Sequence, residues 1–412
     1  MRRSLLAAVS SLALCGSLVS AASADVTVGG QGATCGDDPA CINRIHSDIP
    51  MAASADPGER ILFIGRDAED LQLDPDVLSE SVASPGEGLD VVHPLTGPVH
   101  INGAERGDVI GVTIEAIYPG EVGWTSASDF GFAADIVRTE ERFIVWRLND
   151  EYAESEALPG VRIPNRSFPG VVTTLPGRDQ LQTILDREQA LADAGGSVLV
   201  PGGNLASPAR LCGTDGTEPE RCLRTIPPRE FGGNMDIRYI RPGVTVYLPC
   251  MIDGCGLAIG DFHYAQGDGE VSGTAVEMDA DIAVRVKIVD EPAGLARGPH
   301  YEGPASALSI PSDRFYAVTG FPFKEPGDIP REIVYLADAK VSELSNLSND
   351  INLAARNALA SMIDYISGTY GYDRTQAYMI ASVAVDLRIG QLVDTPNVGV
   401  TALLQLDIFV DR

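Results

Sequence analysis

"GDVIGVTIEAIYPG", residues Gly107–Gly120, is the stretch that decides the fold. Within it, Ile110, Val112 and Ile114 alternate with small or polar residues such as Thr113 and Glu115. Successive side chains of a strand point to opposite faces of a sheet, so this period of two predicts a strand with one buried face. The stretch therefore favours a β-rich fold.

Similar short apolar runs recur across residues 60–340. They are "RFIVWRL" (142–148), "GSVLVPG" (196–202), "VTVYLPC" (244–250) and "IAVRVKIV" (282–289). Each is bounded by Gly, Pro or a charged residue, and each is predicted to be a strand.

Three helices are also predicted, fewer than the strands. They cover about Gln180–Ala194, about Asn349–Ser367 with Gly368 as its C-cap, and residues 374–387 after Asp373 as N-cap. The mixture predicts a mainly β domain over residues 25–412, built as a β-sandwich or open barrel with α+β additions. Residues 40–340 form its β-rich part, and residues 341–412 form a C-terminal part of helices and strands.

Residues 1–24 have the pattern of a secretory signal peptide. Arg2 and Arg3 precede an apolar run, and Ala22-Ser23-Ala24 is an A-x-A cleavage site. The run is too short and too rich in Ser to favour the alternative, a membrane anchor. We expect cleavage of this signal and a periplasmic or secreted protein without a membrane partner.

The chain is strongly acidic. It has 30 Lys and Arg against 58 Asp and Glu, a formal charge of −28, and loss of the two leader arginines gives 28 − 58 = −30. Nucleic acid and anionic membranes are therefore excluded as partners.

Six of the seven cysteines form close pairs in the sequence, while Cys15 belongs to the signal peptide. The pairs are Cys35 and Cys41, Cys212 and Cys222, and Cys250 and Cys255. An even number of cysteines in an exported chain predicts three local disulfides. A thiolate metal site is the alternative, but the chain has no C-x-x-C motif.

"GDFHYAQGDGE", residues Gly260–Glu270, concentrates titratable side chains on a glycine-rich backbone. Asp261 and His263 are two positions apart, and on an extended segment such residues share a face. Both could therefore reach one ion or one substrate.

Two segments, "LPGVRIPNRSFPGVV" (158–172) and "REQALADAGGSVLVP" (187–201), fit the formamidase-like branch of the acetamidase/formamidase family. Four further segments resemble the family as a whole. They are "HPLTGPVHINGAERGDVIGVTI" (93–114), "TIPPREFGGNMDIRYIRPGVTVYLP" (225–249), "GDFHYAQGDGEVSGTAVEM" (260–278) and "AYMIASVAVDLRIGQLVDTPNVGVTALLQLDIF" (377–409). The resemblance covers about residues 40–411. "RIHSDIP" (44–50) departs from the family pattern because a Trp and a Pro are missing, although His46 is kept.

The resemblance implies hydrolysis of a short linear amide, of formamide or acetamide type, to a carboxylate and ammonia. It also implies a jelly-roll-like β architecture and a homo-oligomer. Other outcomes are an exported member that acts on another small amide or ester, or a secreted ligand-binding β-sandwich without catalysis. Retention of Asp236, Asp261, His263 and Glu270 argues against the last of these.

Amide hydrolysis needs a nucleophile, and the residues leave water as the best candidate. The chain has no G-x-S-x-G motif, Ser272 has no Lys nearby, and the cysteines are paired. A divalent ion with imidazole and carboxylate ligands would lower the pKa of a bound water to about 7. Zinc is one such ion.

Candidate roles follow from this chemistry. The proposed metal ligands are Asp261, His263, Asp236 and His93; the proposed general base is Glu270, with Glu105 as the alternative; the proposed substrate-binding residues are Asn234, Gln266 and His46. Structural roles compete at several positions, because Asp236, Glu105 and Asp268 all stand in turn-like contexts.

Overall fold

The computed structural model describes residues 26–71, 73, 86–129, 131–138, 141–193, 195–196, 198–292, 295, 298–336, 339–391 and 398–410. The predicted signal peptide lies outside these residues. Strands dominate, so the prediction of a mainly β fold is confirmed. In the described part of the chain, no helix has the length and apolar character needed to span a membrane.

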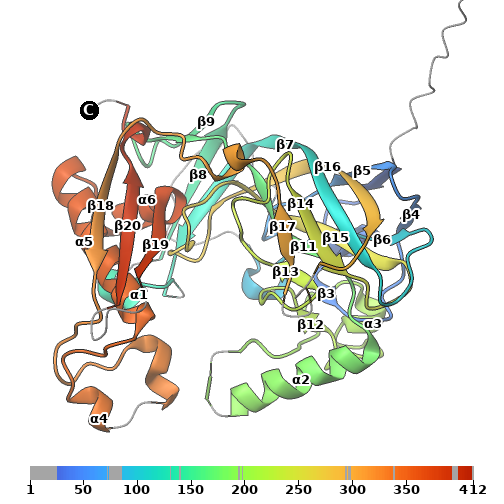
Figure 1. Cartoon of the computed structure of the whole chain (residues 1–412). Coiled ribbons are helices and arrows are strands. Elements are labelled where there is room, and N and C mark those ends of the chain that lie inside the picture. Colours follow the sequence, from blue (N-terminus) through green and yellow to red (C-terminus); the bar gives the residue numbers. More distant parts are fainter. Residues whose placement is uncertain are drawn as a thin grey trace, which may run out of the picture.

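One 15-stranded sheet forms most of the molecule (Figure 1). Its strands are β1 (Val26–Gly29), β2 (Cys41–Ile42), β4 (Ala53–Ala55), β5 (Arg60–Ile64), β6 (Leu95–Ile101), β7 (Val109–Ala127), β8 (Arg142–Leu148), β9 (Tyr152–Glu154), β10 (Arg162–Pro164), β11 (Phe168–Thr173), β13 (Gly232–Asn234), β14 (Thr245–Pro249), β15 (Cys255–Ala265), β16 (Val276–Val289) and β17 (His300–Glu302). The main path runs β10-β9-β8-β7-β16-β15-β11-β13.

The alternating stretch that predicted the fold lies in β7, which pairs antiparallel with β16 along most of its length. Ile110, Val112 and Ile114 are fully buried, as their period of two predicted. The strands predicted over residues 142–148, 244–250 and 282–289 are confirmed as β8, β14 and part of β16.

β15 is the innermost strand, and all 11 of its residues are buried. It pairs with β6, β11 and β16, so its backbone is fixed on both sides. The signature Gly260–Glu270 begins in β15 and continues into the loop that follows it. The most tightly held strand of the sheet therefore carries the most titratable segment of the sequence.

A separate three-stranded sheet forms the C-terminal unit, drawn in orange and red in Figure 1. It consists of β18 (Phe315–Gly320), β20 (Gly399–Gln405) and β19 (Val385–Gln391), with α5 (Ile351–Tyr370) and α6 (Arg374–Ala384) beside them. β18 precedes residue 341, so this unit takes one strand from the segment that the sequence assigned to the β-rich part.

The remaining elements are β3 (Arg44–Ile45), β12 (Leu223–Arg224), α1 (Ala134–Val137), α2 (Arg178–Asp193), α3 (Ala209–Cys212) and α4 (Ala339–Ser342).

Two helix ends differ from their predictions. α5 continues through Gly368 to Tyr370, and Gly371 instead takes the left-handed C-cap conformation with a φ of 79°. α6 starts with the predicted cap, since Asp373 and Gln376 form a capping box, but it stops at Ala384. The following residues pair with β20 as β19, because that sheet edge is available to them.

The strand predicted for "GSVLVPG" is wrong. The described residues from 198 to 202 form neither strand nor helix, and Leu199 and Val200 are 36% and 41% exposed. An apolar run becomes a strand only where a neighbouring strand can pair with it, which the local sequence does not specify.

All three predicted disulfides are present. They join Cys35 to Cys41, Cys212 to Cys222 and Cys250 to Cys255, with Cα–Cα distances of 5.2, 5.5 and 4.4 Å. The alternative of a thiolate metal site is therefore excluded for these cysteines.

Candidate active site

A cavity of about 730 Å³ lies at the end of β15 and β16 that carries the signature. Side chains from distant parts of the sequence line it. The titratable ones are Glu69, His93, Asp129, Glu141, Asp236, Asp261, His263, Glu270 and Glu277. The cavity thus unites most of the predicted site residues.

His263 is the centre of this group. Its Nε2 lies 3.3 Å from Oδ1 of Asp261 on the same strand and 3.1 Å from Oε2 of Glu277 on β16. His263 and Glu277 are direct cross-strand partners in the β15–β16 register. Each of the three side chains is at most 3% exposed.

Asp261 reaches His263 through an unusual backbone conformation, with a φ of +56° inside a strand. Gly170 lies opposite it on β11, between the paired residues Pro169 and Val171. A Cβ atom on Gly170 would lie 2.4 Å from Oδ2 of Asp261 and 2.6 Å from Oδ1 of Asp236. Gly170 is therefore required for the close approach of the two carboxylates.

Asp236 and Asn234 come from β13 and the residues directly after it. Nδ2 of Asn234 donates a hydrogen bond of 2.8 Å to Oδ2 of Asp236, while Oδ1 of Asn234 is buried without a hydrogen-bond partner. His93 approaches from the residues before β6, with its Nε2 4.0 Å from Oδ1 of Asp261. Its backbone N–H donates to Oγ1 of Thr225.

Gln266 supports His263 from behind and does not line the cavity. His263 Nδ1 lies 2.8 Å from Oε1 of Gln266, an acceptor only, so Nδ1 carries the proton and Nε2 faces the acids. Nε2 of Gln266 donates to the backbone carbonyl of Asp236. The sequence proposed substrate binding for Gln266, whereas its contacts orient the imidazole.

Glu270 stands on the loop that follows β15 and has a φ of +42°. The C-terminal unit holds this loop. Ser382 of α6 accepts from the backbone N–H of Gly267 through its carbonyl and from that of Ser272 through its Oγ. Leu387 of β19 donates its N–H to the carbonyl of Asp268.

The local electrostatics give the two aspartates of the site different pKa values. Burial raises the pKa of Asp236 to about 7, and the negative charge of Asp261 adds to the effect. Burial alone would also raise the pKa of Asp261, but the neighbouring His93 and His263 lower it to about 2. At neutral pH Asp261 is therefore ionised, whereas Asp236 exchanges between its protonated and its ionised form.

The remaining groups hold protons more firmly than usual. Burial and the charge of Asp236 raise the pKa of Glu270 well above its ordinary value. Burial raises the pKa of Glu277 as well, although the His263 imidazolium opposes this. Burial opposes the charge on His263, but Glu277 and Asp261 raise its pKa well above 6.5.

Two sets of ligand atoms are close enough to hold a cation. The atoms of Asp236, Asp261 and His263 lie within 4.8 Å of one another, and so do those of His263, Glu270 and Glu277. Oδ1 of Asp236, Oδ1 of Asp261 and Oε2 of Glu277 are buried without a hydrogen-bond partner. Unpartnered carboxylate oxygens beside an imidazole nitrogen fit a divalent metal ion.

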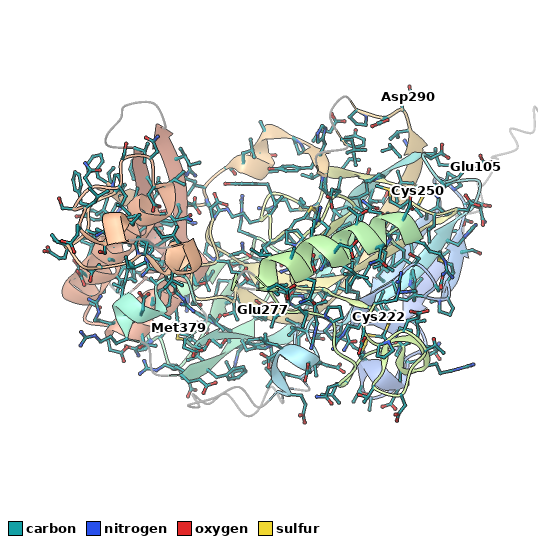
Figure 2. All side chains as sticks on the ribbon, turned by 90° about the horizontal axis from the view of Figure 1, so that it is seen from below. Glu105, Cys222, Cys250, Glu277, Asp290 and Met379 are labelled. Carbon is teal, nitrogen blue, oxygen red and sulfur yellow. A yellow bond between two sulfur atoms is a disulfide. The ribbon has the colours of Figure 1, made fainter. Side chains whose placement is uncertain are left out.

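Besides Gln266, two predicted residues do not reach the cavity. Glu105 lies in the exposed turn before β7, where its backbone N–H donates to Oδ2 of Asp108, and Figure 2 shows it far from Glu277. His46 is buried elsewhere, and its Nδ1 accepts the backbone N–H of Asp48. Glu277 was missed because it lies before the strand predicted over residues 282–289; its signal in the sequence is an acid between the apolar residues Val276 and Met278.

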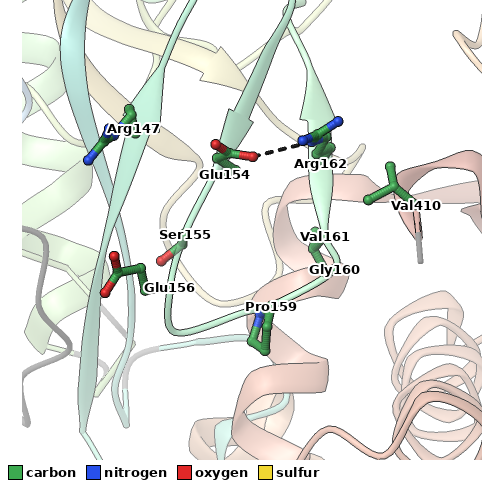
Figure 3. Close-up of a pocket in the computed structure, with 9 residues that line it drawn as sticks. All are labelled: Arg147, Glu154, Ser155, Glu156, Pro159, Gly160, Val161, Arg162 and Val410. Carbon is green, nitrogen blue, oxygen red and sulfur yellow. Dashed lines mark hydrogen bonds and ion pairs between the residues drawn. The ribbon is translucent and has the colours of Figure 1, made fainter. Parts of the chain in front are cut away.

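A second cavity of about 340 Å³ lies beside β9, β10 and Val410 (Figure 3). Its charged residues include Glu154 and Arg162, which pair at 3.2 Å while 44% and 45% exposed. An exposed ion pair in water contributes little binding energy. The buried acids and imidazoles mark the first cavity as the candidate active site.

Comparison with known proteins identifies the relatives of the chain. The chain is 31% identical over 368 residues to an acetamidase of Mycolicibacterium smegmatis, covering 82% of this chain and 84% of that one. It is 28% identical over 393 residues to a formamidase of Methylophilus methylotrophus, covering 89% of each. The solved structure of a gamma lactamase from Delftia acidovorans superposes with a TM-score of 0.80 at 26% identity, covering 94% of this chain and 93% of that one.

The comparisons also give the class of reaction and the family. Relatives named acetamidase and formamidase hydrolyse amides, and the conclusion that this chain is an amidohydrolase of linear amides follows from them. Residues 31–411 match the sequence model of the Acetamidase/Formamidase family, and the chain belongs to that family.

Proposed function

We propose that the chain hydrolyses a short linear amide, of formamide or acetamide type, with water as the nucleophile and a divalent cation as cofactor. The observation that carries the proposal is the convergence of Asp236, Asp261, His263, Glu270 and Glu277 in one cavity. Zinc is our first choice of cation, because the donors are one imidazole nitrogen and several carboxylate oxygens.

The charge balance supports a cation. Among the described residues that line the cavity there is no Lys or Arg to offset the acids. We assign Asp236, Asp261 and His263 as ligands, with His93 or Glu277 able to complete the set. Such an ion supplies Lewis acidity, which lowers the pKa of a nearby water and polarises a carbonyl group.

The side chains of the chain perform the remaining tasks. Glu270 takes a proton from the attacking water and later delivers it to the leaving nitrogen. Asn234 accepts the amide N–H of the substrate at Oδ1, the atom that is buried without a partner. Gln266 keeps the His263 ring oriented throughout.

Glu270→Gln tests this assignment. The amide keeps the size of the side chain but cannot accept the proton, so turnover of acetamide should fall by about 10²–10⁴-fold. Elemental analysis of the wild type should find a divalent metal, and Glu270→Gln should keep it. Turnover above about a tenth of the wild-type value would assign the base to another residue, and active protein free of metal would remove the cation from the proposal.

A small cyclic amide is a second candidate substrate, and the Delftia acidovorans gamma lactamase favours it. The two reactions differ in their products. A linear primary amide releases ammonia, whereas ring opening of 2-pyrrolidinone keeps the nitrogen in the product. An assay for ammonia beside an assay for 4-aminobutanoate therefore separates them.

We also propose that the protein is exported and forms a homo-oligomer. The leader over residues 1–24 and the three disulfides support export. Protein isolated from outside the cytoplasm should begin at Asp25 on N-terminal sequencing. Light scattering that gives only the monomer mass of the chain would contradict the oligomer.

A further inference from the structure

The size of the cavity is the first observation that bears on the identity of the amide. Its volume of about 730 Å³ falls within the range of about 300–1,000 Å³ that is typical of pockets for much larger ligands. Formamide and acetamide are only a few times larger than a water molecule, which occupies about 30 Å³ in the liquid. Either would leave most of the cavity unfilled.

The products of the reaction indicate which side of the scissile bond carries the larger group. The reaction of the relatives named acetamidase and formamidase releases ammonia, and for such a substrate the nitrogen side of the scissile bond carries no large group. The unfilled volume therefore belongs to the acyl side.

Part of the cavity wall is apolar. It is formed by Leu89, Val92, Trp124, Ala127, Phe132 and Ile226. Trp124 is rigid, since its ring stacks on Phe143 at 5.2 Å and its Nε1 donates a hydrogen bond to Oδ1 of Asp67. Such a wall binds a hydrocarbon chain by removing apolar surface from water.

Three further acids set the charge of the outer cavity. Glu69, Asp129 and Glu141 line it but belong to neither set of close ligand atoms. Asp129 and Glu141 are exposed. Arg331 stands beside them, since it donates to the backbone carbonyls of Asp129 and Gly131. No Lys or Arg is among the described lining residues, so the three acids outnumber this cation and the outer cavity attracts cations more than anions.

We infer that the preferred substrate within this class is a primary amide whose acyl chain is apolar, longer than acetyl, and uncharged or positively charged at its far end. This inference rests on the proposed amide hydrolysis and specifies its substrate class. The apolar wall holds the chain, and the outer acids exclude amides that end in a carboxylate.

A matched series of amides tests the inference on the metal-loaded mature protein. The series contains acetamide, pentanamide, 5-aminopentanamide and the monoamide of glutaric acid, with ammonia release as the readout. We expect kcat/KM for pentanamide to exceed that for acetamide by about tenfold or more. 5-Aminopentanamide should exceed the glutaric monoamide by about tenfold or more.

A double substitution tests the outer acids directly. Asp129→Asn with Glu141→Gln should lower the ratio of kcat/KM for 5-aminopentanamide to that for the glutaric monoamide by about threefold or more. The matched control is Asp290→Asn with Glu291→Gln, two exposed acids outside the cavity, which should leave the ratio unchanged.

The outcomes separate the inference from the proposed function. Acetamide turned over better than pentanamide, or equal turnover of the charged pair, overturns the inference while amide hydrolysis stands. Ammonia release from none of the four compounds overturns both.

Discussion

The backbone conformations of three individual residues bring the acids of the candidate site close together. Asp236, Asp261 and Glu270 all have positive φ angles, of 48°, 56° and 42°. Residues other than glycine adopt this region at a cost, and such strain is concentrated at functional sites. The site is therefore built by local distortion of β13, β15 and the loop after β15.

Gly170→Ala should damage the site without damaging the fold. The new methyl group would lie within 3 Å of both Asp236 and Asp261, so the two carboxylates must separate. We expect affinity for the divalent metal to fall by about 10–100-fold, with a comparable loss of acetamide turnover. Metal titration of the chelated protein measures the first effect, and a thermal melt checks the fold.

Gly368→Ala is the matched control for Gly170→Ala. Gly368 lies in α5 with no atom near its would-be Cβ, so Ala there should leave metal affinity unchanged and stabilise the helix by about 1 kcal/mol. Unchanged metal affinity in Gly170→Ala would mean that the two carboxylates do not share an ion.

The sequence predicted some of these residues and not others, for a physical reason. Asp261, His263 and Glu270 belong to one short motif, and the structure brings them together in one cavity. Glu277 meets His263 only through the antiparallel register of two strands, which a local pattern does not specify. Glu105 lies in a segment that resembles the family, and its carboxylate was a candidate base, but its turn is exposed to solvent.

At the level of elements, the Cys250–Cys255 disulfide and the candidate site lie toward opposite ends of β15. Cys250 directly follows β14 and Cys255 begins β15, whereas Asp261 and His263 lie toward the other end of β15. Asp261 lies six positions after Cys255, which corresponds to about 20 Å of strand. Along that length β6 and β11 hold the strand by hydrogen bonds.

Replacing both Cys250 and Cys255 by Ala should therefore affect stability more than catalysis. A loop this short gives a stabilisation of about 2 kcal/mol on chain-entropy grounds, so the melting temperature should fall. Turnover per folded molecule should stay within about twofold of the wild type, because neighbouring strands hold the site end of β15. Ammonia-release kinetics and a thermal melt on the same preparation check both expectations, and a large loss of turnover in fully folded protein would contradict them.

Elements were predicted where their signals are local. The period-two stretch in β7 and the Asp373 N-cap of α6 are confirmed because alternation and capping act over a few residues. The strand expected at "GSVLVPG" and the helical continuation into residues 385–387 are wrong because sheet pairing decided both outcomes. The C-terminal sheet joins β18 to strands more than 60 residues later, which no local pattern predicts.

On the scale of the whole molecule, the excess of acids makes buried carboxyls important for stability. Asp67 is one that takes no part in the proposed chemistry. It is 5% exposed, and its Oδ1 accepts hydrogen bonds from Nε1 of Trp124 and from the backbone N–H of Glu69. Burial nevertheless raises its pKa well above 3.8, because two hydrogen bonds do not replace the lost hydration.

This raised pKa has a definite sign in its effect on folding. Between the unfolded pKa near 4 and the higher folded pKa, the folded chain binds more protons at Asp67 than the unfolded chain does. The free energy of unfolding therefore falls as pH rises through this window, and the loss persists above it. An Asn at position 67 can accept the same two hydrogen bonds at Oδ1 and carries no charge.

Asp67→Asn should consequently stabilise the protein at high pH and not at low pH. We expect the melting temperatures of variant and wild type to be similar at about pH 4, where both side chains are neutral. The variant should melt higher by about 1 °C or more at pH 8. Thermal melts at intervals between these pH values measure the difference, with Asp290→Asn as an exposed control that should show no such trend. A difference that does not change with pH would mean that Asp67 ionises in the folded protein as easily as in the unfolded chain, and that its two hydrogen bonds fully compensate for burial.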